Sequence, residues 1–232
     1  MDLERYNRHI ILPEIGVDGQ SKLNKAKVLV VGAGGLGSPV LTYLAASGVG
    51  TIGIVDDDVV SRSNLQRQIL YKTSEIGQVK AEKAKERLLE NNPEVSIEIF
   101  NTRLSAANAT AIAEKYEIIV DCTDNYDSRY IIDKVSVDLK IPMVYGSISK
   151  FAGQVAVFNY NGSKSYRDLF DEKPEIDESD PSRLGVLGVL PGIIGAIQAN
   201  EVLKIILELS GVLANTLFLV DSKTMETKRI NF

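Results

Sequence analysis

The chain has 232 residues, 44% of them hydrophobic and 25% charged, which is ordinary for a globular protein. It contains one cysteine, Cys122, one histidine, His9, and no tryptophan, which excludes an internal disulfide and a structural zinc site built from cysteine and histidine. Its formal net charge of −5 argues against broad electrostatic binding to nucleic acid or to acidic lipid.

The first 26 residues are polar and mixed in charge, so we interpret residues 1–26 as an N-terminal arm and not as a signal peptide. The longest strongly apolar stretch, residues 184–194, is interrupted by glycines and a proline and is too short to span a membrane. We therefore expect a cytoplasmic protein that binds neither membrane nor nucleic acid.

Short apolar runs alternate with helix-favouring segments through the next part of the chain, residues 27–150. Strands are predicted at residues 27–31, 51–55, 95–100, 117–120 and 141–145. Helices are predicted between them at residues 38–47, 78–90, 105–116 and 126–139. This alternation predicts a Rossmann-like α/β fold, in which a mostly parallel sheet carries helices on both faces.

The pattern changes in the C-terminal part, residues 151–232. Antiparallel strands are predicted to complete the sheet at residues 153–160, which read as exposed, and at residues 216–220 and 227–230. The acidic segment 161–183 has no clear period, so we expect it to be a mobile surface loop. Residues 191–209 are apolar on most faces and predict a buried helix. We expect a single domain over residues 1–232.

A glycine-rich loop follows the first predicted strand and opens the first helix. It has the pattern G-x-G-x-x-G and contributes Gly32, Gly34, Gly35 and Gly37. Such glycines let backbone amides approach a phosphate at a helix N-terminus. Asp56 and Asp58 end the next strand, where a carboxylate can accept hydrogen bonds from ribose hydroxyls. The structural alternative is a tight turn without a ligand. A nucleotide site is favoured, and NAD, FAD and ATP all remain open at this point.

Basic and amide side chains follow directly after the Asp56 strand. The run S-N-L-Q-R-Q contains Asn64 and Arg67, and Lys80 begins the next predicted helix. Cleavage of ATP between its α- and β-phosphates requires such cations, because negative charge accumulates on the departing pyrophosphate, whereas hydride transfer does not. Taken alone, Arg67 and Lys80 are typical of solvated surface charges. Their position after a glycine-rich loop favours contact with phosphates.

A second polar cluster, D-C-T-D-N, follows the predicted strand at residues 117–120. The carboxylate of Asp124 can hold Mg²⁺ against triphosphate oxygens at this edge of the sheet, with Asn125 beside it. The structural alternative is that Asp124 or Asn125 caps the following helix. Cys122 lies behind an apolar strand, so we predict that it is a small buried residue and not a nucleophile.

These segments together resemble the ThiF/MoeB/HesA branch of the ubiquitin-activating superfamily. The resemblance covers essentially the whole chain, and S-N-L-Q-R-Q and V-D-C-T-D-N are its most specific motifs. It implies that the protein adenylates the C-terminal Gly-Gly carboxylate of a ubiquitin-like sulfur carrier, ThiS- or MoaD-like, and releases pyrophosphate. The implied cofactors are ATP and Mg²⁺, and the implied pathway is thiamine or molybdenum-cofactor biosynthesis.

The resemblance also implies roles for the matching residues. Gly35 would lie in the loop under the nucleotide, and Asp56 would hold the ribose. Asn64, Arg67 and Lys80 would contact the phosphates. The carrier's own carboxylate is the nucleophile at the α-phosphorus, so positioning and charge neutralisation are sufficient for this chemistry.

Two further roles follow from the resemblance. Asp124 would organise Mg²⁺. Members of this family are typically homodimers in which an arginine of the N-terminal arm reaches the partner's ATP, and that role falls here on Arg8. Without the family, Arg8 is only a cation on a terminal arm.

The chain departs from the family pattern in its cysteines. Family members commonly hold zinc with two C-x-x-C pairs, but the place of the first reads S-Y-R-D from Ser165 to Asp168, so zinc is not expected. Some relatives carry a cysteine for covalent chemistry where this chain has Pro181. We therefore predict adenylation without a covalent enzyme intermediate, with sulfur delivered by a separate donor. Segment 161–183 has two interpretations. It covers the C-terminal tail of the carrier, or it is a surface loop without a function in binding.

Two other functions remain open. An NAD-dependent oxidoreductase would use the glycine loop and Asp56 but leaves Asn64, Lys80 and Asp124 unexplained. A non-catalytic adaptor that binds a ubiquitin-like protein would fit the missing cysteines. The residues do not decide between a thiamine and a molybdopterin carrier.

Overall fold

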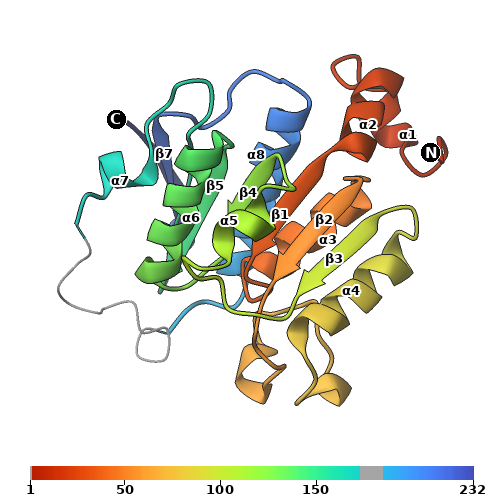
Figure 1. Ribbon diagram of the computed structural model, residues 1–232, viewed down its shortest axis with the longest axis horizontal. Coiled ribbons are helices and arrows are strands. Elements are labelled where there is room, and N and C mark those ends of the chain that lie inside the picture. Colours follow the sequence, from red (N-terminus) through yellow and green to blue (C-terminus); the bar gives the residue numbers. More distant parts are fainter. Residues whose placement is uncertain (1, 173–184) are drawn as a thin grey trace.

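Eight strands form one sheet in a computed structural model that describes residues 2–172 and 185–232 (Figure 1). The strand order is β3-β2-β1-β4-β5-β6-β7-β8. Strands β1 to β5 are parallel to one another, and the pairings from β5 through β6 and β7 to β8 are antiparallel. The strands are β1 (Lys27–Val31), β2 (Thr51–Val55), β3 (Ser96–Phe100), β4 (Ile118–Asp121), β5 (Met143–Ser149), β6 (Ala152–Phe158), β7 (Thr216–Asp221) and β8 (Glu226–Asn231). The predicted fold class is confirmed.

The helices cover both faces of this sheet, as predicted (Figure 1). They are α1 (Asn7–Ile10), α2 (Gly16–Lys25), α3 (Gly37–Ala46), α4 (Lys80–Asn91), α5 (Ala109–Ala113), α6 (Tyr126–Leu139), α7 (Tyr166–Leu169) and α8 (Leu190–Ile206). The helix predicted at residues 105–116 is shorter, because the Asn108 side chain accepts a hydrogen bond from the Ser105 amide and so stabilises a turn ahead of α5. The arm contains two helices that its polar composition did not predict.

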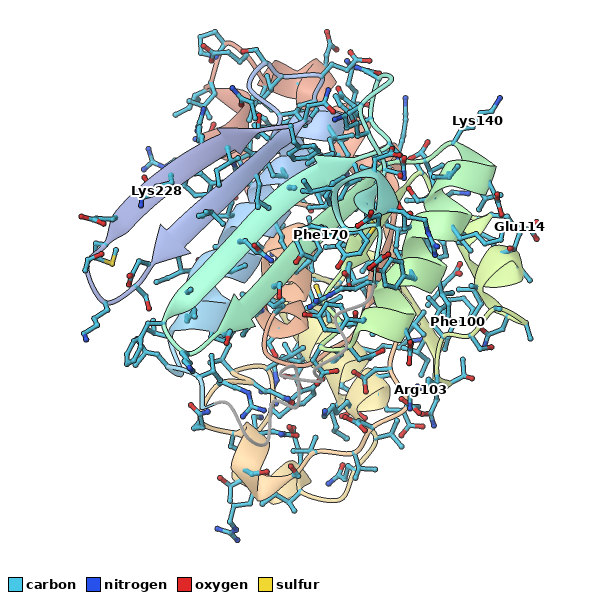
Figure 2. All side chains as sticks on the ribbon, turned by 90° about the vertical axis from the view of Figure 1, so that its left-hand side faces the viewer. Phe100, Arg103, Glu114, Lys140, Phe170 and Lys228 are labelled. Atoms are coloured by element: carbon cyan, nitrogen blue, oxygen red, sulfur yellow. The ribbon has the colours of Figure 1, made fainter. Side chains whose placement is uncertain are left out.

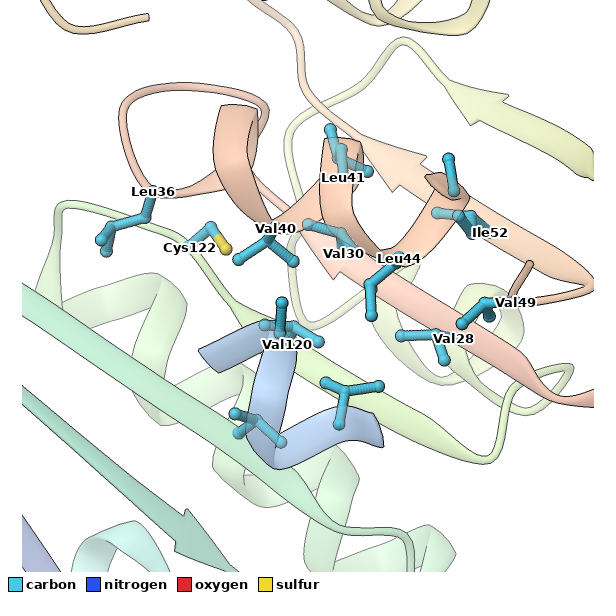
Figure 3. Packing of buried hydrophobic residues seen from close by; sticks show 14 of the residues in the cluster. Val28, Val30, Leu36, Val40, Leu41, Leu44, Val49, Ile52, Val120 and Cys122 are labelled. Carbon is cyan, nitrogen blue, oxygen red and sulfur yellow. The ribbon is translucent and has the colours of Figure 1, made fainter. Parts of the chain in front are cut away.

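Two apolar cores lie on the two faces of the sheet, and β1 contributes to both by alternation. Val28 and Val30 pack on the side of α3 and α8, while Leu29 and Val31 pack on the side of α5 and α6. Figure 3 shows the first of these cores, where Cys122 lies beside Val40 of α3. Burial on both faces explains why the parallel strands read as continuous apolar runs.

Strand β6 is antiparallel as predicted, but the prediction that it is exposed is wrong. Val155, Ala156, Val157 and Phe158 are all buried. Strands β5 and β7 flank β6, and α8 covers one of its faces so closely that a Cβ at Gly153 would lie 2.4 Å from Ile194. The alternation in the sequence therefore reflects two different covering layers and not a solvated face.

The described part of the segment predicted to be a mobile loop contains a short helix, α7, that packs against the sheet. Tyr166 of α7 is buried, and its ring meets that of Phe158 edge to face at a centroid distance of 5.7 Å. The Asp133 carboxylate accepts a hydrogen bond of 2.8 Å from the Tyr166 amide. The ring of Phe170, which is labelled in Figure 2, lies 4.8 Å from the ring of the same tyrosine, measured between centroids. Residues 173–183 of the predicted loop lie outside the described residues. In the described part of the chain no helix is long and apolar enough to cross a membrane.

Candidate active site

A cavity of about 580 Å³, called the main cavity below, lies at the carboxyl ends of the parallel strands. This edge is where open α/β sheets bind ligands. Most of the predicted site residues line this cavity, namely Gly32, Gly34, Gly35, Asp56, Asp58, Asn64, Arg67, Lys80, Asp124 and Asn125. The structure thus brings together residues from five separate segments of the sequence.

The glycine loop is shaped by contacts that leave no room for side chains. Gly32 has a φ of +95°, and a Cβ there would lie 2.7 Å from the carbonyl oxygen of Cys122. A Cβ at Gly37 would lie 2.0 Å from the carbonyl oxygen of Gly32, so Gly37 closes the loop on itself. Gly37 was predicted to bind the cofactor, but it is not among the residues that line the cavity. The loop therefore lines the cavity with Gly32, Gly34 and Gly35.

Asp56 is held in place by the glycine loop itself. One carboxylate oxygen accepts a hydrogen bond from the Ala33 amide at 2.7 Å, and the other accepts one from the Asp58 amide at 2.9 Å. Burial raises the pKa of Asp56, and these two amides oppose that rise. A carboxylate offers about four lone-pair sites, so two remain for ribose hydroxyls.

Lys80 carries a buried positive charge into the cavity from the first residue of α4. Its side chain is 3% exposed, whereas that of Asp58, to which its ammonium is paired at 2.8 Å, is 70% exposed. An ammonium has three donors. The pair with Asp58 uses one of them, which leaves donors for phosphate oxygens.

The segment with Asn64 and Arg67 forms a tight turn against the glycine loop. A short 3₁₀ helix, η1 (Arg62–Asn64), ends at Asn64, whose carbonyl oxygen accepts hydrogen bonds from the Arg67 and Gln68 amides. The Arg67 guanidinium donates to the carbonyl oxygen of Ser63 at 3.1 Å and retains further donors. The turn also contacts the segment before α8, because a Cβ at Gly188 would lie 2.4 Å from the side-chain oxygen of Gln66.

The two residues that end the D-C-T-D-N cluster have different surroundings. Asn125 caps α6, since its side-chain oxygen accepts a hydrogen bond from the Ser128 amide at 2.9 Å. The structural alternative is therefore confirmed for Asn125, which also lines the cavity. Within the described part of the chain, the Asp124 carboxylate makes no hydrogen bond or ion pair, and it lines the cavity as well.

The donor set fits Mg²⁺ only if a nucleotide supplies ligands too. Among residues 2–172 and 185–232 no group of three or more His, Cys, Asp or Glu side chains is arranged to hold a metal ion. Mg²⁺ is commonly bound through one or two carboxylates together with substrate phosphates and water. The Asp124 carboxylate would be one such ligand, and the ion, when bound, would neutralise phosphate charge.

Arg129 and Gln68 also line the cavity, and sequence reasoning missed both. Both residues are buried. The buried side-chain oxygen of Gln68 has no hydrogen-bond partner among the residues that the structure describes. A signal was present for Gln68, which is part of the S-N-L-Q-R-Q motif. None was present for Arg129, because Tyr145 and Ser147, which contact its guanidinium, come from β5 and have no sequence spacing that connects them to it.

Arg8 is far from the cavity of its own chain. It lies on α1, near the start of β1 and therefore at the opposite edge of the sheet (Figure 1). The neighbouring Tyr6 is buried against Gly48, and its hydroxyl accepts a hydrogen bond from Asn92. The prediction that Arg8 serves a partner's site stays a prediction.

The cysteine positions agree with their sequence interpretation where the structure describes them. Cys122 is buried, as predicted, and burial raises the pKa of its thiol (Figure 3). In place of a first C-x-x-C pair, Ser165 and Asp168 form a capping box at the start of α7. Pro181, which stands where some relatives have a cysteine, lies outside the described residues.

Known structures share this fold. The chain superposes on microcin C7 biosynthetic enzyme MccB in complex with N-formylated MccA with a TM-score of 0.87 and 23% identity, covering 99% of this chain and 72% of that one. E. coli MccB bound to ATP gives a TM-score of 0.85 at 24% identity, covering 98% of this chain and 71% of that one.

Relatives with higher identity carry names that state an activity. A protein of Porphyra purpurea named probable molybdopterin-synthase adenylyltransferase is 49% identical over 97% of this chain and 59% of its own length. A sulfur carrier protein adenylyltransferase of Thermus thermophilus is 45% identical over 95% of this chain and 84% of its own length. The chain thus spans about three fifths of the first of these relatives. The ThiF family model matches residues 6–232, and the chain belongs to the ThiF family.

Proposed function

We propose that this protein adenylates the C-terminal carboxylate of a ubiquitin-like sulfur carrier. The observation that carries the proposal is the convergence of the glycine loop, Asp56, Arg67, Lys80 and Asp124 on one cavity, with hydrogen-bonding capacity left unused. The names of the relatives in the alga and in Thermus support the same activity.

The residues present suit this reaction. A carboxylate oxygen of the carrier attacks the α-phosphorus of ATP, a new P–O bond forms, and the bond to the bridging oxygen breaks as pyrophosphate departs. Arg67 and Lys80 neutralise the charge that accumulates on the pyrophosphate, and Asp56 fixes the ribose. Asp124 would hold Mg²⁺ at the phosphates. No side chain of the protein needs to become covalently attached, which agrees with the burial of Cys122.

A second cavity of about 380 Å³ offers a route for the carrier's tail. It lies along β5, β6 and β7 and shares Ser147, Ile148 and Ser149 with the main cavity. An extended Gly-Gly tail laid along this surface would lead into the main cavity at these shared residues. Its glycines suit the route because they need no side-chain space.

The name of the Porphyra purpurea relative, probable molybdopterin-synthase adenylyltransferase, favours a MoaD-like carrier and molybdopterin synthesis over the thiamine pathway. A homodimer in which Arg8 completes the partner's site, and a separate sulfur donor, belong to the same proposal. We expect no zinc.

Exchange of labelled pyrophosphate into ATP tests the proposal. The exchange should require the protein, Mg²⁺ and a carrier that ends in Gly-Gly, and a carrier lacking the last glycine is the matched control. An NAD-dependent oxidoreductase would bind nicotinamide cofactor in preference to ATP. An adaptor would bind the carrier and give no exchange.

A further inference from the structure

Arg129 is buried in the wall of the main cavity, and none of the roles above uses it. Its side chain is 6% exposed, and its Nε lies 3.5 Å from a carboxylate oxygen of the fully buried Asp121. The guanidinium lies over the rings of Tyr126 and Tyr145, at 5.5 and 5.4 Å from their centroids. A planar group held by two rings and a carboxylate has little freedom, so its remaining donors point in fixed directions.

Those donors join two strand ends. The terminal nitrogen Nη2 of Arg129 donates to the carbonyl oxygen of Thr123 and to the hydroxyl of Ser147, each at 3.2 Å. Thr123 immediately precedes Asp124. Ser147 lies on β5, at the place where the main and second cavities meet. One side chain therefore ties the turn that carries Asp124 to the strand that lies between the two cavities.

We propose that Arg129 is a positioning residue that fixes the Asp124 turn relative to Ser147, so that the carrier's carboxylate meets the α-phosphate at the correct distance. The inference rests on the proposed adenylation and deepens it. The competing explanation is purely structural, in which Arg129 only neutralises the buried charge of Asp121. That role needs a positive charge, whereas alignment needs the planar, forked guanidinium.

The variant Arg129→Lys separates the two explanations. Lysine keeps a positive charge for Asp121 but does not reproduce the bridge between Thr123 and Ser147. We expect its equilibrium dissociation constant for ATP to stay within about threefold of wild type, while kcat of carrier-dependent exchange falls by about tenfold or more. Small misplacements of reacting groups cost that much, and more carrier does not restore the rate.

Two further variants keep the test decisive if Arg129→Lys folds poorly. The double variant Arg129→Met with Asp121→Asn removes the ion pair without leaving a buried charge unpaired. It should melt as a folded protein, bind ATP within about threefold of wild type and lose kcat to the same extent. Ser147→Ala removes one of the two acceptors and keeps the ion pair, and we expect a smaller loss of kcat.

The matched control is Arg167→Lys. Arg167 also carries its guanidinium over an aromatic ring, at 4.8 Å from the centroid of Tyr130, but it lines neither cavity. It should keep the wild-type kcat. A folded Arg129→Lys variant with wild-type kcat, whether or not its ATP binding is weakened, overturns this inference and leaves the proposed function standing. Absence of exchange in the wild-type protein overturns the proposed function and this inference with it.

Discussion

Lys80 allows a sharp test of the electrostatics of the cavity, because its side chain is buried while its partner is not. The ammonium is 2.8 Å from the Asp58 carboxylate, and the exposed fractions of the two side chains are 3% and 70%. Lys80→Met keeps much of the aliphatic stem and removes the charge. Asp58 reaches solvent, and the Ala33 and Asp58 amides still donate to the partly buried Asp56 carboxylate after the substitution. We therefore expect the free energy of unfolding to change by less than about 1 kcal/mol.

The same substitution removes a charged donor from the phosphates. A hydrogen bond to a charged group contributes about 1.5–3 kcal/mol, which corresponds to a fall in kcat/KM for ATP of about 10- to 150-fold. Pyrophosphate exchange measures the rate, and a thermal melt measures folding. The control is Lys83→Met on the same helix, since Lys83 pairs with Glu86 and does not line the cavity. A Lys80→Met variant with wild-type exchange, or an equal loss in Lys83→Met, would refute the reasoning.

Three further predictions concern single residues. Gly188→Ala brings a Cβ to 2.4 Å from Gln66 and should displace the turn with Arg67, so the rate of pyrophosphate exchange should fall several-fold. The control Gly192→Ala meets open space and should keep the wild-type rate. Equal rates in the two variants contradict the idea that the segment before α8 positions this turn. The pKa of Asp56 is raised by burial, and its ionised form accepts the ribose hydroxyls, so adenosine affinity is present above that pKa and lost as the pH falls through it. The variant Asp56→Asn should show no such pH dependence. If the adenosine affinity of the wild type is equally independent of pH, Asp56 does not have that role. Cys122→Ser should keep exchange, and complete loss in a folded variant contradicts a non-covalent mechanism.

The nucleotide side of the site could be predicted from the sequence because its residues lie in short motifs at strand ends. Parallel strands place their carboxyl ends at one edge, so Asp56 after β2 and Asp124 after β4 had to meet there. The glycine loop was recognisable for the same reason. The different roles of its glycines could not be predicted, because they depend on the folded shape of the loop, in which Gly37 closes the loop while Gly35 faces the cavity.

The carrier side of the site depends on contacts between distant elements. The importance of Arg129 rests on Tyr145 and Ser147 of β5, which no spacing in the sequence connects to it. Likewise α7 is ordered by Asp133 and Phe158 from two other elements, whereas its own composition reads as a loop. Long-range side-chain burial of this kind leaves no periodic signal.

The most direct test of the account is the mass of the carrier after reaction. A Gly-Gly-ended carrier is incubated with the wild-type protein, ATP and Mg²⁺, and the intact carrier is then weighed by mass spectrometry. The account predicts a carrier that has gained one AMP at its C-terminus, with release of pyrophosphate and no adduct on Cys122. An unmodified carrier, in the presence of folded protein that binds both ATP and the carrier, contradicts it.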